Sequence, residues 1–154
     1  MMRMKFQTTN ELEHFCFAES YIADIQKIGG CLRFTLDNVT ILPENSRNRD
    51  VRQMRANGLL LHIRDAKVED LIEEGYKVYD ADGNLKEQFP DQPLASAQYN
   101  ETLKALSDGS CSVYALQKEG DRYRFALDGG NDRTYLLCVS GTGDFEEWDR
   151  FLNK

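Results

Sequence analysis

Alternating apolar and polar residues are the dominant pattern in this chain, and they predict β-strands. Residues 31–42 predict one strand, with apolar side chains at even positions up to Leu36 and at odd positions from Val39 onward. A slip of one position is typical of a β-bulge or a tight bend. Residues 59–63 predict a second strand, whose odd positions form a continuous apolar face ending at Ile63.

Short turns join several of the later segments and predict antiparallel neighbours. An Asp-Ala-Asp-Gly-Asn sequence separates residues 76–79 from residues 85–89, and its Asp-Gly and Gly-Asn pairs suit a hairpin turn. Residues 111–118, 122–128 and 134–140 alternate in the same way and are separated by glycine-containing turns. They predict a three-stranded antiparallel meander.

Two segments predict α-helices. In residues 94–107 the apolar side chains recur at intervals of four, four and three, and an Asp-Gly pair follows as a stop signal. In residues 144–153, Asp144 and Glu147 have the spacing of a capping box, and apolar residues follow at helical intervals.

Three other segments complete the predicted organisation. Residues 44–53 are polar without an apolar period and predict an exposed loop. Residues 65–74 fit either an extended strand or a short helix, with the strand favoured, and residues 19–28 fit a short helical turn or a bulged strand. The expected fold is a single α+β domain over residues 1–154, with an antiparallel sheet of about 6–8 strands and two helices.

Length and charge limit the classes of function. The 154 residues are 41% hydrophobic, enough for one core, and no apolar run approaches the roughly 20 residues of a membrane-spanning helix. We see no signal peptide and expect a cytoplasmic protein without a membrane partner. The net charge of −7 divides into +2 over residues 1–67 and −9 over residues 68–154. Nucleic acid is therefore an unlikely partner, and a basic one is favoured.

Cysteine and histidine spacing offers no sign of a metal or cofactor site. Neither a Cys-x-x-Cys nor a His-x-x-x-His spacing occurs, and the chain has only two histidines. We expect no metal, no cofactor and reduced, buried cysteines. His62, between leucines on a predicted strand, is expected to be partly buried and hydrogen-bonded. The four cysteines are Cys16, Cys31, Cys111 and Cys138.

The sequence E-H-F-C-F-A-E-S at residues 13–20 gathers three side chains capable of chemistry: His14, Cys16 and Glu19. If folding brought them together they would line a ligand-binding or catalytic pocket. The alternative is a strand with one aromatic face, because two phenylalanines alternate with these residues. The sequence does not point to any residue as catalytic.

Four arginines, Arg47, Arg49, Arg52 and Arg55, form the one locally basic cluster of the sequence. Arginine binds carboxylates and phosphates through two parallel hydrogen bonds, so the cluster is a candidate ligand or partner site. The alternative is a solvated loop whose charges balance the acidic half of the chain. A nucleic-acid contact is a further possibility, although no aromatic residue is interleaved to stack on a base.

The motif F-x-E-S-x-I-x-x-I at residues 17–25, followed by an L-x-F-x-L strand, resembles a group of small uncharacterised bacterial single-domain proteins. Some of those proteins are grouped with the immunity proteins of polymorphic toxin systems. The resemblance implies a protein-interaction or regulatory role and transfers no catalytic residue.

The leading functional expectation is a non-enzymatic, cytoplasmic protein-interaction or regulatory domain with a protein partner, and an immunity-type protein is one candidate for it. The alternative is a small-molecule-binding protein or an unrecognised enzyme, with a pocket near His14, Cys16, Glu19 and the arginine loop 47–55. The sequence leaves the oligomeric state open.

Overall fold

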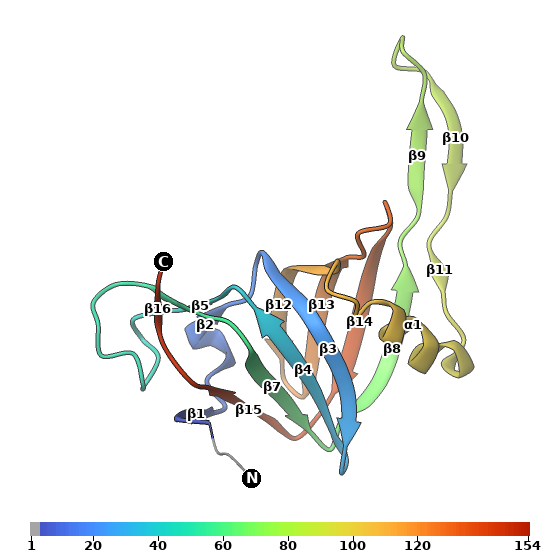
Figure 1. Cartoon of the computed structure of the whole chain (residues 1–154). Helices are drawn as coiled ribbons and strands as arrows, with labels where there is room; N and C mark the ends of the chain where they lie inside the picture. Colours follow the sequence, from blue (N-terminus) through green and yellow to red (C-terminus); the bar gives the residue numbers. More distant parts are fainter. Residues whose placement is uncertain (1–3) are drawn as a thin grey trace.

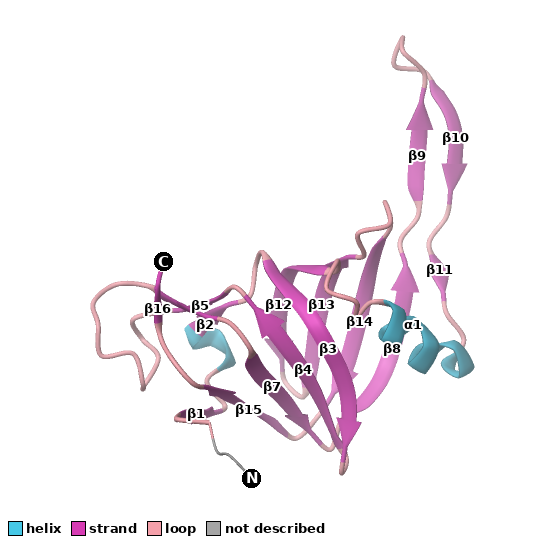
Figure 2. Cartoon of the chain, in the orientation of Figure 1, coloured by secondary structure: helices cyan, strands magenta, loops and turns pink. Residues whose placement is uncertain are grey.

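The computed structural model describes residues 4–154 and shows a mostly antiparallel β protein (Figures 1 and 2). Ten strands form the main sheet, in which every neighbouring pair is antiparallel. In spatial order they are β1 (Phe6–Thr9), β15 (Gly143–Trp148), β7 (Leu59–Arg64), β4 (Cys31–Asp37), β3 (Ser20–Ile28), β12 (Ser112–Glu119), β13 (Arg122–Asp128), β14 (Thr134–Ser140), β8 (Lys67–Glu73) and β11 (Gln92–Pro93).

The main sheet folds back on itself and encloses the core between two layers (Figure 1). The sheet turns back on itself between β3 and β12, which share only two paired positions. Across the layers, the rings of Phe34 on β4 and Phe125 on β13 stack with their centroids 4.7 Å apart. Both rings are almost fully buried, so this contact lies at the centre of the core.

A second sheet of four short strands lies beside one end of the main sheet. Its order is β16 (Leu152–Asn153), β6 (Met54–Ala56), β5 (Val39–Ile41) and β2 (Phe15–Cys16), and the 3₁₀ turn η1 (Leu12–His14) precedes β2. Trp148 is fully buried at this end, where its ring contacts those of Phe6, Phe15 and Phe151.

A two-stranded hairpin projects away from the two layers (Figure 1). We call it the arm; it consists of β9 (Tyr76–Tyr79), β10 (Leu85–Phe89) and the turn between them. The chain returns through β11 to the 3₁₀ turn η2 (Ser96–Gln98) and the helix α1 (Tyr99–Ala105), which Leu103 and Leu106 attach to the core.

Most of the predicted strands are confirmed. The pattern slip after Leu36 corresponds to a sharp bend at Asn38, which has a left-handed φ of 62° and separates β4 from β5. Within residues 65–74 the favoured strand is present as β8 (Lys67–Glu73), and within residues 19–28 the bulged strand is present as β3 (Ser20–Ile28), with a register shift near its start. The arm, the three-stranded meander and the loop over residues 44–53 also lie where they were expected.

The prediction of an α+β fold with two helices is wrong. Within residues 4–154 the structure has one α-helix, and its main sheet has ten strands rather than about 6–8. The helix expected over residues 94–107 is shorter, because the Leu94 amide donates to the Leu71 carbonyl oxygen and Ala95 is still extended.

The helix expected over residues 144–153 is absent, and β15 and β16 occupy the segment. β15 pairs with β1 on one side and with β7 on the other, which fixes an extended backbone. Every second residue of β15 is buried, namely Asp144, Glu146 and Trp148. Two of these three buried residues are acidic, so the sequence does not show the apolar alternation expected of a strand. Asp144 was therefore misread as a helix cap.

The core contact between the layers gives a first prediction. Phe34→Ala should lower the free energy of unfolding by about 3–5 kcal/mol, because it removes a fully buried ring and leaves a cavity against Phe125. Tyr114→Ala, at a side chain that is 61% exposed, should change it by about 0.5 kcal/mol or less. Urea unfolding of both variants measures the difference, and equal effects would contradict the two-layer packing.

Candidate functional site

The three side chains predicted to share a pocket have different surroundings. His14 ends η1 and lies 3.1 Å from Glu11, measured from Nδ1 to Oε1. Cys16 is exposed on β2, where it lines a hollow that contains neither His14 nor Glu19. Glu19 occupies a left-handed turn with a φ of 69°, and its amide donates to the Val113 carbonyl oxygen.

His14 belongs to a polar cluster with Glu11 and Ser46. The Ser46 hydroxyl donates to Glu11 Oε2, and Glu11 Oε1 accepts from the Ser46 amide and also contacts His14 Nδ1. Burial raises the pKa of Glu11, but these hydrogen bonds outweigh it and hold the pKa below its ordinary value. A nucleophilic serine needs the histidine beside its hydroxyl, whereas here the carboxylate lies between the two. The cluster therefore attaches the loop over residues 44–53 to η1.

The four predicted arginines do not converge on one point. Arg52 forms an ion pair with Asp50, with 3.0 Å between Nη2 and Oδ2. Arg47 donates from Nε to the Gln7 carbonyl oxygen, and Arg55 donates from Nη1 to the Asn57 amide oxygen. Arg49 is exposed. The two hydrogen bonds and the ion pair secure the loop and β6 locally.

His62 is half-buried and hydrogen-bonded, as expected. Its Nε2 lies 3.1 Å from Glu147 Oε2, and its ring stacks on Phe145 with the centroids 4.0 Å apart. Burial is the main cause that lowers the pKa of His62, while Glu147 opposes the shift. These contacts belong to the pairing of β7 with β15 and contain no nucleophile.

Sequence reasoning missed a buried pair of carboxyl groups, Asp144 and Glu146, which are both fully inaccessible to solvent. The Tyr123 hydroxyl donates to Asp144 Oδ1 at 2.7 Å, and Lys118 Nζ lies 3.7 Å from the same oxygen. The Thr8 hydroxyl contacts Glu146 Oε2 at 3.5 Å. Four strands, β1, β12, β13 and β15, therefore supply the surroundings of the pair.

Glu146 is the member of this pair whose protonation is perturbed by the fold. Burial, and secondarily the neighbouring Asp144, raise the pKa of Glu146 to about 10, so Glu146 is protonated. Asp144 Oδ2 and Glu146 Oε1 have no hydrogen-bond partner outside the pair among residues 4–154, and a hydrogen bond between the two side chains contributes to the raised pKa of Glu146. The cleft that Lys118 lines contains neither carboxyl group. The pair is therefore a sealed hydrogen-bonded unit that a solute does not reach.

Both faces of the arm carry exposed apolar side chains. Tyr76 pairs with Phe89 across the two strands, and their rings stack with the centroids 4.5 Å apart. Tyr79 pairs with Leu85 on the opposite face, and their side chains are 55% and 52% exposed. Large apolar groups on an exposed surface mark an interaction site when they gather in one place.

The base of the arm is held by contacts with neighbouring residues, whereas the two strands of the arm pair only with each other in the described chain. The Arg133 guanidinium lies 4.2 Å from the centroid of the Tyr76 ring and forms an ion pair with Glu73 at 3.6 Å. The Gly75 amide donates to Asp91 Oδ1, and a side chain at Gly75 would collide with the Phe89 carbonyl oxygen. The direction of the arm is therefore set by contacts at its base.

The arm and its supporting strand are strongly acidic. Residues 67–91 contain eight aspartates and glutamates against three lysines, which gives a net charge of −5. The apolar side chains of the arm therefore lie in a negative field, which attracts a positively charged surface.

Three further findings concern metal ions, membranes and known proteins. Across residues 4–154 no group of three or more His, Cys, Asp and Glu side chains is arranged to hold a metal ion. No helix in that same range is long and apolar enough to span a membrane. Comparison with protein-family models, with curated proteins and with solved structures finds no match to this chain.

The buried carboxyl pair predicts a pH-dependent stability. Folding raises the pKa of Glu146 from 4.5 to about 10, so the folded protein keeps a proton that the unfolded chain releases. This stabilisation is complete below pH 4.5 and declines as the pH rises toward 10. Glu146→Gln does not titrate, so the variant should gain stability relative to the wild type as the pH rises, by at most roughly 1.4 kcal/mol per pH unit.

Urea unfolding at about pH 5 and about pH 8 measures this gain, because both pH values lie between the unfolded and the folded pKa of Glu146. Glu87→Gln, at an exposed position on the arm, is the matched control. Its free energy of unfolding should differ from that of the wild type by the same amount at both pH values. A Glu146→Gln variant that follows the wild type at both pH values would show that the buried proton is absent.

Proposed function

We propose that this chain is a non-enzymatic protein-interaction or regulatory domain of the immunity type, and that its partner binds the arm. The observation that carries this proposal is the exposure of Tyr79 and Leu85 on a hairpin that projects from the two layers. The resemblance of residues 17–25 to proteins grouped with toxin immunity proteins points to the same class of function.

The physical chemistry of an isolated hairpin supports a partner at the arm. A single two-stranded hairpin is marginally stable in water without a third strand or a packed helix. In the described chain β9 and β10 pair only with each other, so each has an outer edge with free amide and carbonyl groups. Tyrosine is also enriched at interfaces, where its ring gives contact area and its hydroxyl a hydrogen bond.

The charge of the arm region indicates the chemistry of the partner. The net charge of −5 over residues 67–91 repels acidic proteins and attracts basic ones. We propose a basic protein surface with an apolar centre, which would cover the arm residues and neutralise the acidic residues around them.

The other polar clusters favour binding over catalysis. The Glu11 carboxylate separates Ser46 from His14, and the Asp144 and Glu146 carboxyl groups are sealed inside the protein. We also propose a cytoplasmic location, because all four cysteines are free thiols, which suits a reducing compartment.

Disruption of the arm tests the proposal. A Tyr79→Ser, Leu85→Ser double variant and the wild type are each immobilised, and proteins captured from the source cells are identified and then purified. The affinity of the purified partner should fall at least about 30-fold for the variant, because central interface residues contribute about 2 kcal/mol or more. Isothermal titration calorimetry measures both dissociation constants.

Tyr114→Ser is the matched control, since it removes an equally exposed tyrosine from β12 on the body of the protein. It should bind the partner as the wild type does. Equal affinities for the wild type and the arm variant, with both proteins folded by circular dichroism, would exclude the arm as the binding surface. A captured partner that is acidic would exclude the proposed charge complementarity.

A further inference from the structure

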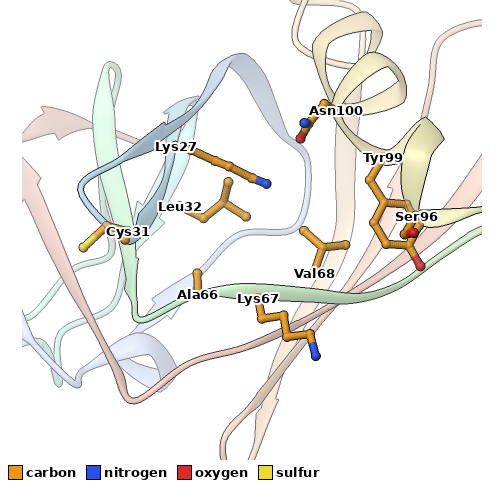
Figure 3. A pocket seen from close by; sticks show the side chains of 10 residues that line it. Lys27, Cys31, Leu32, Ala66, Lys67, Val68, Ser96, Tyr99 and Asn100 are labelled. Carbon is orange, nitrogen blue, oxygen red and sulfur yellow. The ribbon is translucent and has the colours of Figure 1, made fainter.

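A preformed cleft lies where three distant parts of the chain meet (Figure 3). We call it the Lys27 cleft; it is bounded by the turn between β3 and β4, the start of β8, and residues 96–100, and its volume is about 370 Å³. Pockets of about 300–1,000 Å³ are the usual size for small-molecule ligands. The Lys27 cleft therefore has room for one small ligand.

Hydrogen bonds and packing fix the walls of the cleft. The Ala66 amide donates to the Gly30 carbonyl oxygen at 2.9 Å, which holds the two turns side by side. The Tyr99 hydroxyl contacts the Glu69 carbonyl oxygen at 3.5 Å and joins α1 to β8. Leu103, only 4% exposed, anchors the same helix to the core. A ligand would therefore enter without reorganising the fold.

The cleft combines an apolar floor with an ammonium group. Leu32, Ala66 and Val68 supply apolar side chains on its floor. Figure 3 shows the side chains of Lys27 and Asn100 pointing into the space beside Leu32 and Val68, whereas the Lys67 side chain points away from it. A charged donor and an amide thus face the same space above an apolar surface.

Electrostatically the cleft differs from the rest of the molecule. The chain has 26 acidic residues, yet none of them lines this cleft. Among the ion pairs of residues 4–154 none involves Lys27, so no carboxylate is in direct contact with its ammonium group. An adjoining hollow shares Lys27 and adds Lys104, and its lining also includes Asp24 and Asp108.

We propose that the Lys27 cleft binds a small organic anion. The anionic group, a carboxylate or a phosphate ester, accepts hydrogen bonds from the Lys27 ammonium and the Asn100 amide. The apolar body of the ligand covers Leu32, Ala66 and Val68. Charge-assisted hydrogen bonds orient the anion, and removal of apolar surface from water supplies the remaining affinity. This site is separate from the arm and does not depend on a protein partner.

Titration of the isotope-labelled protein with defined probes tests the proposal. Hexanoate and hexyl phosphate carry an anionic group on an apolar chain, hexanol lacks the charge, and inorganic phosphate lacks the chain. We expect saturable changes in the amide resonances of Gly30, Ala66 and Asn100 with at least one of the first two probes. Hexanol and inorganic phosphate should bind at least about tenfold more weakly, because each lacks one of the two interactions.

Substitution at the ammonium group gives the decisive comparison. Lys27→Gln should weaken binding of the better probe about tenfold or more, because it removes the positive charge that strengthens the hydrogen bond to the anion. Lys27→Arg should retain binding, and Lys86→Gln on the arm, which removes the same charge elsewhere, should leave it unchanged.

Unchanged affinity in Lys27→Gln would overturn the proposal, as would resonance changes that do not saturate or that lie outside the cleft. Inorganic phosphate that binds as tightly as hexyl phosphate would exclude the apolar part of the site. The ratio of the hexanoate and hexyl phosphate affinities identifies which anionic group the cleft prefers.

Discussion

The position of β15 between β1 and β7 is the constraint on which much of this structure depends. Hydrogen bonding on both sides fixes an extended backbone, and its alternation then places Asp144, Glu146 and Trp148 inside the protein. Two ionised carboxylates buried side by side would repel strongly, so Glu146 keeps its proton, and Asp144 accepts a hydrogen bond from the Tyr123 hydroxyl. Strand β15, late in the chain, thereby joins β1, early in the chain, to the rest of the main sheet.

Local patterns made the strands predictable where the neighbour in space is also the neighbour in sequence. The meander of β12, β13 and β14 follows this rule. Strand β7 pairs with β4 and β15, which are not its neighbours in sequence, and it was predictable from the alternation of Leu59, Leu61 and Ile63 alone. The prediction failed at residues 144–153, because β1 and β7 lie far away in sequence and the inward positions are acidic. It also failed at Leu94, whose amide is bound by a distant carbonyl group.

Proximity in sequence proved a poor guide to the functional surfaces. Alternation along the strand exposes Cys16 and buries the phenylalanines on both sides of it, as the aromatic-face alternative predicted, while a left-handed turn redirects the chain at Glu19. The Lys27 cleft unites three segments that no spacing connects. The turn residues predicted the hairpin of the arm. They did not predict that β9 and β10 stay separate from the main sheet, because this depends on which strands lie beside them.

Strand β8 links the two proposed binding surfaces without making them dependent on each other. Val68, near its start, lines the Lys27 cleft, and Glu73, at its end, joins the base of the arm through Arg133. Between these points β8 pairs with β14, and a paired strand transmits little change unless it has a second stable arrangement. Since both the cleft walls and the arm base are fixed by hydrogen bonds and packing, little ordering remains to be done when either surface binds. These contacts lead to a rigid body with a preformed cleft and a fixed arm base, from which the two less stable strands of the arm project.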